Sequence, residues 1–142
     1  MSNDMIYLAG PYSSPDSEVR SARAAQLTRI AAEVMAYNGA PVFSPITHGH
    51  EIAAQLASIN PALAELHAFW LDQCIAILRH AGQLWIAPLE GWRTSKGIAE
   101  EVKVARMLNL PIYILQTAHL FLEALDGNEL EELNYIPVWE LK

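Results

Sequence analysis

Short apolar runs that alternate with helix-like stretches are the feature that most constrains how this chain folds. The first run, Met5 to Ala9, ends at Gly10-Pro11, which is typical of a buried strand that closes in a turn. Three further short apolar runs are predicted as strands: Pro41 to Phe43, Leu84 to Pro88 and Pro111 to Leu115. Strands that alternate with helices of about ten residues or more predict right-handed crossovers and a mostly parallel sheet.

Between the strands, apolar residues recur at the spacing of an amphipathic helix. This periodicity predicts three helices: Ser17 to Tyr37, Pro61 to His80, and Gly97 to Leu108. The segment from Ser44 to His50 is expected to be a loop, because it contains a proline and a glycine. In the tail, Leu120 to Leu125 is expected to form a short helix and Ile136 to Trp139 an edge strand.

The length and composition of the chain fit one such domain. A chain of 142 residues falls in the usual size range of a domain, and 52% of its residues are apolar while 18% are charged. This balance allows a sheet that is covered on both sides. The prediction is a single α/β domain over residues 1–142, with a Rossmann-like (flavodoxin-like), mostly parallel sheet of about five strands and helices on both faces.

Charge and cysteine content exclude several classes of partner and site. The net charge of −7 and the isoelectric point near 5.1 argue against a nucleic acid polymer as ligand. Cys74 is the only cysteine, so neither an intrachain disulfide nor a multi-cysteine metal site is expected. No apolar run reaches the ~20 residues of a membrane span, and residues 1–4 do not resemble a signal peptide. We expect a cytoplasmic protein that does not bind a membrane.

Glu101 is the first candidate for a chemical role. The sequence has no GxGxxG, no Walker A and no GxSxG motif, so the commonest nucleotide and serine-hydrolase sites are not expected. Glu101 lies on the apolar side of the third predicted helix, near its start. A carboxylate directed towards the sheet edge there is desolvated and available to a ligand. A glutamate that only complements the helix dipole is the alternative interpretation.

Tyr7 and Asp72 each allow two interpretations as well. Tyr7 lies in the first predicted strand, close to the loop that follows it, where a phenol can orient a carboxylate. Tyrosine is also an ordinary strand residue that packs in a core. Asp72 interrupts an apolar helical stretch, but Glu65 and Arg79 share its predicted face, which is typical of a solvated aspartate.

Two histidines, His48 and His50, stand two residues apart in the predicted loop. Imidazoles at this spacing can share a metal ion, but no further ligand spacing accompanies them. Histidines that line a polar pocket or cap the next helix fit the same pattern. We therefore predict no metal site.

Several short motifs, in this order, resemble the nucleoside 2-deoxyribosyltransferase superfamily. They are Ile6-Tyr7-Leu8-Ala9-Gly10-Pro11-Tyr12, Asp72 in the middle helix, and Ser95-Lys96-Gly97-Ile98-Ala99-Glu100-Glu101 followed by Ala105 and Leu110-Pro111-Ile112. In that superfamily the first strand reads like YLAGP, and a serine-x-glycine turn opens a helix whose glutamate precedes an alanine by four residues. The chain is most similar to a bacterial and phage branch of uncharacterised proteins, the DUF1937 type, over about residues 5–115.

The resemblance implies cleavage or transfer at the N-glycosidic bond of a (deoxy)nucleoside or nucleotide. Glu101 would be the nucleophile that forms a glycosyl ester, Tyr7 the residue that orients it, and Asp72 a residue that contacts the base or relays a proton. If a base attacks the ester, the sugar is transferred; if water attacks it, the sugar is released by hydrolysis. Both outcomes are open, and neither needs a cofactor. The alternatives are a non-catalytic nucleoside or nucleotide sensor and, at His48-Gly49-His50, a metal-assisted hydrolase.

Ten further residues are predicted to bind the substrate. They are Gly10, Pro11, Ser13, Ser14, His48, His50, Glu90, Trp92, Ser95 and Gly97. Glu90 stands near the place of the superfamily's base-reading residue, and Trp92 could stack on a base. An anion would bind best at the start of the first helix. Asp16 and Glu18 lie there and no arginine precedes Arg20, which favours a nucleoside over a 5′-monophosphate.

Assembly is predicted from large apolar residues that look exposed: Trp70, Phe121, Tyr135 and Trp139. We expect a homo-oligomer, either a dimer or a tetramer. Relatives in the superfamily complete each pocket with residues of a neighbouring chain, so the segment from Asn134 to Trp139 is expected to reach a partner's site.

Overall fold

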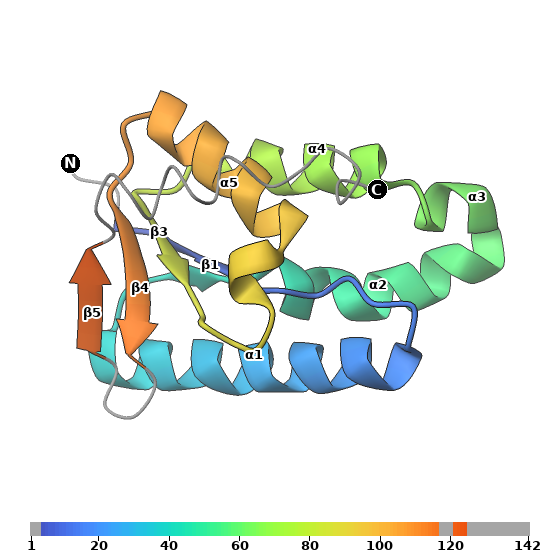
Figure 1. Cartoon of the computed structure of the whole chain (residues 1–142), viewed down its shortest axis with the longest axis horizontal. Coiled ribbons are helices and arrows are strands. Elements are labelled where there is room, and N and C mark those ends of the chain that lie inside the picture. The colour runs from blue at the N-terminus through green and yellow to red at the C-terminus, as the bar shows by residue number, and fades with distance from the viewer. Residues whose placement is uncertain (1–3, 117–120, 125–142) are drawn as a thin grey trace.

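The computed structural model describes residues 4–116 and 121–124, which form a five-stranded sheet with helices on both faces (Figure 1). The strand order is β2-β1-β3-β4-β5. The strands are β1 (Ile6–Ala9), β2 (Val42–Phe43), β3 (Gln83–Ile86), β4 (Ile112–Gln116) and β5 (Phe121–Ala124). The first four strands are mutually parallel, and β5 runs antiparallel to β4. The predicted α/β class with a mostly parallel sheet is confirmed.

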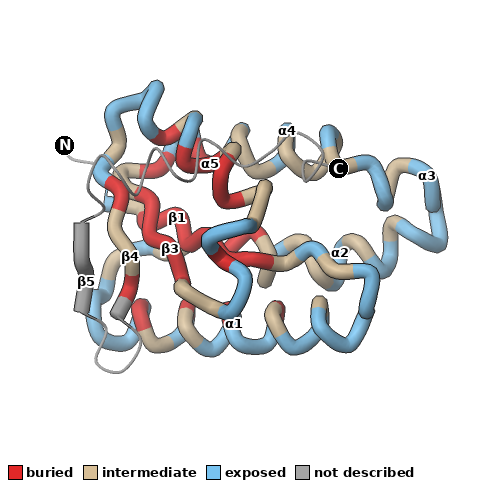
Figure 2. The backbone as a smooth tube through the Cα atoms, in the orientation of Figure 1, coloured by how far each residue is buried: buried red, intermediate tan, exposed pale blue. Residues whose placement is uncertain are grey.

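Strand β1 sits inside the sheet and sends alternate side chains into two separate core clusters. Ile6 and Leu8 pack with residues of α1 (Ser17–Asn38) on one face. Tyr7 and Ala9 pack on the other face, which α4 (His67–Leu78) and α5 (Lys96–Met107) cover (Figure 1). Buried residues accordingly concentrate in β1, β3 and the part of α5 that faces the sheet (Figure 2).

Helix α1 begins and ends at the residues that its capping signals predict. The Asp16 side chain accepts a hydrogen bond from the Glu18 amide at 2.9 Å, and Gly39 ends the helix with a left-handed φ of 78°. Gly10 lies under this helix, where a Cβ atom would stand 2.5 Å from Leu27 Cδ2. A larger residue at this position would therefore require the Leu27 side chain to move.

The expected loop from Ser44 to His50 is wrong, because this segment opens helix α2 (Pro45–Ile59). Ser44 caps the helix by accepting a hydrogen bond from the Thr47 amide at 3.3 Å. Pro45 occupies the first turn, where a backbone N–H would have no partner within the helix, so proline costs no hydrogen bond there. Gly49 is accommodated inside the helix, where its Cα packs near the Trp70 ring. The proline and the glycine were therefore misleading loop signals.

The predicted single helix from Pro61 to His80 is interrupted. It divides into α3 (Pro61–Ala64) and α4, and Leu66 between them has an extended backbone with φ −83° and ψ 106°. The Trp70 indole nitrogen donates to the Ala64 carbonyl oxygen at 2.7 Å, which satisfies a group that the break sets free. Trp70 is thus half-buried and hydrogen-bonded, which removes it as evidence for an exposed assembly surface.

The expected helix from Leu120 to Leu125 is also wrong, since residues 121–124 form strand β5. Pairing with β4 overrides the helical spacing of the apolar residues there. The predicted edge strand from Ile136 to Trp139, Tyr135 and the Asn134 to Trp139 arm lie outside the described residues. Among the described helices, none is long and apolar enough to cross a membrane.

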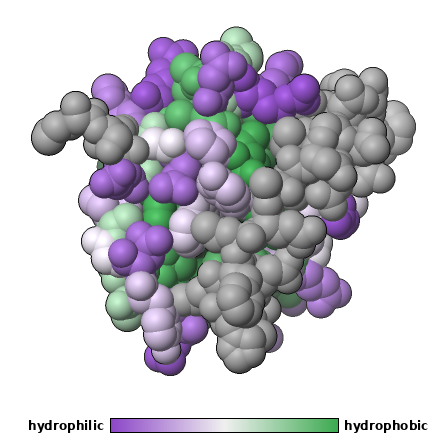
Figure 3. All heavy atoms as spheres, turned by 90° about the vertical axis from the view of Figure 1, so that its left-hand side faces the viewer, coloured by the Kyte–Doolittle hydropathy of each residue, from purple (hydrophilic) through white to green (hydrophobic). Residues whose placement is uncertain are grey.

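The two ends of the parallel strands differ in what surrounds them. Figure 3 views the end from which β1 starts, where hydrophilic side chains surround visible apolar ones in the part that is not grey. At the opposite end, α2, α3 and the start of α4 extend past the strands (Figure 1). The loops after β1 and β3 end there too, so this end is where a ligand site is expected in a parallel sheet.

Candidate active site

Tyr7 and Glu101 meet on the face of the sheet that α4 and α5 cover. Tyr7 comes from the middle of β1, and Glu101 comes from the second turn of α5, among the apolar residues that face the sheet. The Tyr7 hydroxyl donates a hydrogen bond to Oε2 of Glu101. Tyr7 has no exposed surface and Glu101 has 6%. The predicted convergence of these two side chains is confirmed.

Burial dominates the electrostatics of the pair. Loss of hydration raises the pKa of Glu101 from 4.5 to about 7, because the ionised carboxylate is disfavoured away from water. The hydrogen bond from Tyr7 opposes this rise in pKa, and the nearby charge of Glu100 adds to it. The pKa of the Tyr7 phenol is raised, first by burial and then by the Glu101 charge, so Tyr7 stays a donor.

Cys74 of α4 is the third polar group at the pair. Burial raises the pKa of its thiol to about 11, and the charge of Glu101 acts in the same direction. The thiol lies within hydrogen-bonding reach of Tyr7. Phe43 at the end of β2 covers the Tyr7 ring from the side, with ring centroids 6.1 Å apart. The pair is therefore enclosed by β1, β2, α4 and α5.

The structure does not bring Asp72 to the pair. Asp72 is exposed, whereas Cys74, two residues further along α4, faces Tyr7 and Glu101. Residues two apart on a helix point about 160° from one another. The polar group that α4 presents to the pair is Cys74, and Asp72 lies on the solvent side.

A second pair, His67 and Glu100, joins the same two helices. His67 Nε2 of α4 lies 3.7 Å from Glu100 Oε1 of α5, too far for a hydrogen bond. This nitrogen is enclosed and has no hydrogen-bond partner, although the His67 side chain as a whole is 30% exposed. Because Glu100 adjoins Glu101 in sequence, the two pairs are neighbours.

Two arginines of α1 hold the loops that follow β1 and β3. Arg20 donates to the Ser14 carbonyl oxygen, and Arg23 donates to the carbonyl oxygens of Ser13 at 3.0 Å and Glu90 at 3.2 Å. Three of the predicted substrate-binding residues are thereby brought to one place. The lack of an arginine before Arg20 does not keep cations away from the loop, because the side chains of Arg20 and Arg23 reach back to it from within the helix.

His48 and His50 of α2 lie near the same end of the sheet, but each contacts a different residue. His50 Nδ1 is 2.7 Å from the Tyr12 hydroxyl, and the two rings meet edge to face. His48 is exposed and packs on Phe43, with ring centroids 5.4 Å apart. Among the described residues, no group of three or more histidine, cysteine, aspartate or glutamate side chains could hold a metal ion.

The remaining predicted residues have structural positions around the site. Ser95 caps α5 by accepting a hydrogen bond from the Ile98 amide at 3.3 Å, and Gly97 leaves the first turn of that helix uncrowded. Pro11 is buried beside Gly10. Trp92 is only 9% exposed and packs in the core, and the Arg93 guanidinium lies 4.4 Å from its ring centroid. Its ring is therefore not open to a stacking base here.

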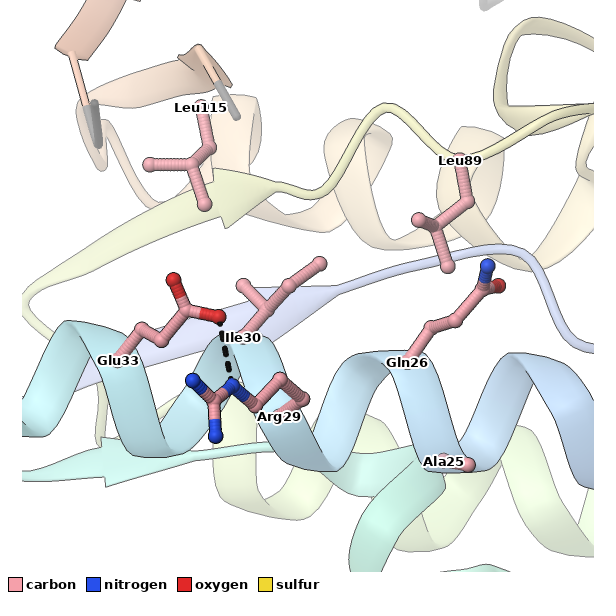
Figure 4. Close-up of a pocket in the computed structure, with 7 residues that line it drawn as sticks. All are labelled: Ala25, Gln26, Arg29, Ile30, Glu33, Leu89 and Leu115. Carbon is pink, nitrogen blue, oxygen red and sulfur yellow. Dashed lines mark hydrogen bonds and ion pairs between the residues drawn. The ribbon is translucent and has the colours of Figure 1, made fainter. Parts of the chain in front are cut away.

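A groove of about 480 Å³ opens on the other face of the sheet (Figure 4). It is lined by α1 residues together with Leu89 and Leu115, and its edge carries the 3.0 Å ion pair between Arg29 and Glu33. The sheet separates this groove from Glu101, so it is not the site at which Glu101 would act.

Several residues of the site escaped prediction from sequence. Cys74 and His67 are seven residues apart on the apolar face of the predicted helix, but the spacing does not reveal which side chains that face contacts. The contacts of Phe43 and Arg20 could be predicted only by knowing which strands are neighbours in the sheet. Only the spacing of Arg20 and Arg23, one helical turn apart, was a readable signal that two cations share a face.

The fold and the site define a parallel α/β domain with a buried tyrosine–glutamate pair beside the converging loops. Residues 4–117 match the family described as a domain of unknown function, DUF1937. Because the match covers most of the chain, the protein belongs to this family. No curated protein matches the chain.

Proposed function

We propose that this protein cleaves the N-glycosidic bond of a nucleoside or nucleotide, or transfers its sugar to a second base, through an ester on Glu101. The observation that carries the proposal is the hydrogen bond from the Tyr7 hydroxyl to Glu101 Oε2. It fixes one oxygen of the carboxylate and so directs the other. The resemblance of the motifs to the nucleoside 2-deoxyribosyltransferase superfamily supports the same roles for these two residues.

A buried, oriented carboxylate suits this reaction. Glycosidic bonds break through a state in which positive charge develops on the sugar, and a carboxylate near the anomeric carbon stabilises that charge. As a bond forms between the Glu101 oxygen and this carbon, the bond to the base breaks and its electron pair leaves with the base. A second base or water then attacks the ester and frees Glu101.

The ionisation of Glu101 sets a testable pH dependence. Only the carboxylate form can attack, and burial raises the pKa of this group to about 7. The fraction of the free protein that is competent therefore increases as the pH rises through about 7. We expect kcat/KM for base release to increase over the same interval.

The contacts of the arginines support a nucleoside over a nucleotide as substrate. A 5′-phosphate near the start of α1 would need free donors. The guanidinium groups of Arg20 and Arg23 already donate to carbonyl oxygens of the loops after β1 and β3. These contacts direct the guanidinium groups to the loop backbone, and the Asp16 carboxylate that caps the helix would repel a phosphate there.

The direct test is incubation with a panel of deoxynucleosides and their 5′-monophosphates, with and without an acceptor base, followed by chromatography. Glu101→Ala should lower base release by about a thousandfold or more, because it removes the nucleophile. Glu33→Ala is the matched control, since this glutamate lies on α1 and pairs with Arg29 at the surface. It should leave the rate within about twofold.

Mass spectrometry separates an enzyme from a sensor. A 2-fluoro-2-deoxyribosyl substrate with an activated leaving group slows breakdown of the ester, so the wild type should gain one sugar mass on Glu101 and Glu101→Ala none. Binding of nucleosides with neither base release nor an adduct would replace the enzyme by a sensor. An adduct on another residue would show that the nucleophile had been misassigned.

A further inference from the structure

Helix α4 turns one face towards the buried pair, and Cys74 marks that face. A helix rotates by about 100° per residue, so His67, seven residues earlier, lies within about 20° of the direction of Cys74. The approach of His67 to Glu100 of α5 agrees with this placement. Of the polar side chains on this face, that of His67 is an imidazole, the side chain that most often acts as a general acid or base.

His67 lies nearer the start of α4 than Cys74, the residue of this helix that is close to Glu101. Seven residues of helix span about 10 Å, so His67 lies that far from Cys74 along the axis. Helix α4 starts beyond the carboxyl ends of the strands and runs back towards the sheet (Figure 1). His67 therefore lies towards the carboxyl ends of the strands, where parallel sheets bind their ligands. In the proposed reaction the base leaves on the side of the anomeric carbon opposite to the Glu101 oxygen, and we infer that this side faces His67.

The Nε2 atom of His67 is an unmet hydrogen-bonding group. It is enclosed, has no hydrogen-bond partner, and lies 3.7 Å from Glu100 Oε1. A buried polar atom without a hydrogen bond is disfavoured, so native structures keep few of them. A ring nitrogen or carbonyl oxygen of a bound base would satisfy it, and the Glu100 carboxylate is close enough to orient the ring.

We propose that His67 is the catalytic residue that protonates the departing base, an inference that rests on the proposed function. As the Glu101 oxygen bonds to the anomeric carbon, the carbon–nitrogen bond breaks and its electron pair stays on the base. The proton of His67 Nε2 passes to a nitrogen of that base, which leaves neutral. In the second step, an acceptor base or water returns a proton to His67 as it attacks the ester.

The other candidates at this end are less well placed. His50 already pairs through Nδ1 with the Tyr12 hydroxyl, and His48 packs on Phe43 at the surface of α2. Asp72 faces away from Cys74 and is exposed. His67 combines an enclosed nitrogen that makes no hydrogen bond with a place on the helix face that contacts the Tyr7–Glu101 pair.

The test compares two leaving groups in His67→Gln. A nucleoside base needs a proton to leave, whereas 4-nitrophenolate leaves from 4-nitrophenyl 2-deoxyriboside without one. His67→Gln should lower kcat/KM for the best nucleoside by about a hundredfold or more and for the aryl glycoside by less than about fivefold. His80→Gln, at an exposed histidine just after α4, is the matched control and should change neither rate beyond about twofold.

Each contrary outcome has a distinct meaning. Equal loss on both substrates in a His67→Gln protein of unchanged melting temperature would assign His67 to positioning and overturn the proposal. A loss confined to the nucleoside in Asp72→Asn or His48→Gln, with His67→Gln unaffected, would also overturn it. In both cases a Glu101 adduct in the wild type leaves the proposed function standing.

A second variant covers the case in which His67→Gln fails to fold. His67→Ala should recover nucleoside cleavage when imidazole is added, because free imidazole can supply the proton. The rate on the aryl glycoside should not respond. Absence of rescue in a folded His67→Ala protein would count against the proposal. A wild type with neither activity nor adduct would overturn the proposed function itself.

Discussion

The two faces of the sheet take alternate side chains of the same strand, yet among residues 4–116 only one face buries a carboxylate. Ile6 and Leu8 of β1 enter a core cluster of hydrophobic side chains beneath α1. Tyr7, between them, points to the opposite face and meets Glu101. The two-residue period of a strand is thus enough to separate a purely structural face from a face that holds a candidate site.

The two faces differ in the free energy that it costs to bury an ionised carboxylate. Burial raises the pKa of Glu101 from 4.5 to about 7, which corresponds to roughly 3 kcal/mol against the ionised carboxylate. A buried ionisable group with a specific partner near converging loops is typical of a functional site, and this feature distinguishes the α4 and α5 face from the α1 face.

Removing a side chain from the α1 face should have the largest effect on stability. Leu27 has no exposed surface and packs against Ile6 and Leu8. Leu27→Ala should lower the free energy of unfolding by about 2–5 kcal/mol, by a similar amount at pH 5 and pH 8, because no charge is involved. Urea denaturation measures this. Met35→Ala, at a residue that is 49% exposed on the same helix, should change it by less than about 0.5 kcal/mol.

On the opposite face, Glu101→Gln should stabilise the protein, and only at higher pH. The folded-state pKa of Glu101 is raised, so the folded protein holds its proton where the unfolded chain has lost it, and stability falls between about pH 4.5 and 7. Glutamine has no charge to bury. Its gain over the wild type should be small near pH 4 and up to about 3 kcal/mol at pH 8 in urea unfolding. An equal gain at both pH values would contradict the buried charge.

Most of the architecture follows from local signals, and the errors occur where local signals mislead. The apolar runs and the helical spacing between them predict the parallel strands and their crossovers, because such periods are properties of neighbouring residues. Pro45 and Gly49 suggest a loop, yet Pro45 fits a first helical turn and Gly49 packs near Trp70. Strand β5 forms because β4 offers it hydrogen bonds, which its own sequence does not reveal.

The candidate site was predictable as far as helix and strand periods reach. Glu101 lies on the apolar side of its helix, and Tyr7 lies in the strand that the helix covers, so their meeting could be expected. The exposed position of Asp72 agrees with the charged residues Glu65 and Arg79 on its predicted face. The break at Leu66 and the contact of His67 with Glu100 could not be predicted, because they depend on how α4 packs against α5.

A smaller destabilisation is expected where β1 leaves the sheet. A Cβ atom at Gly10 would stand 2.5 Å from Leu27 Cδ2, so Gly10→Ala should cost about 1–3 kcal/mol as α1 shifts away. The double variant with Leu27→Ala tests the cause, since the smaller residue makes room for the methyl group. In urea denaturation, the double variant should lose less unfolding free energy than the sum of the losses of the two single variants. Simple additivity would show that the strain lies elsewhere.

Tyr7→Phe should have the smallest effect on folding, and its effect on the reaction should depend on pH. The ring stays in the core, but Glu101 loses the hydrogen bond that lowers its pKa, so this pKa should rise above about 7. The midpoint of the pH profile for base release should therefore move to higher pH. At pH values above this midpoint, the rate of Tyr7→Phe should be about tenfold lower than that of the wild type, because the carboxylate is less well oriented. Tyr37→Phe, at a residue that is 80% exposed, should leave the profile unchanged. A uniform fall at every pH with an unmoved midpoint would mean that the hydroxyl shapes the core without tuning the carboxylate, and the two faces of β1 would then differ in packing alone.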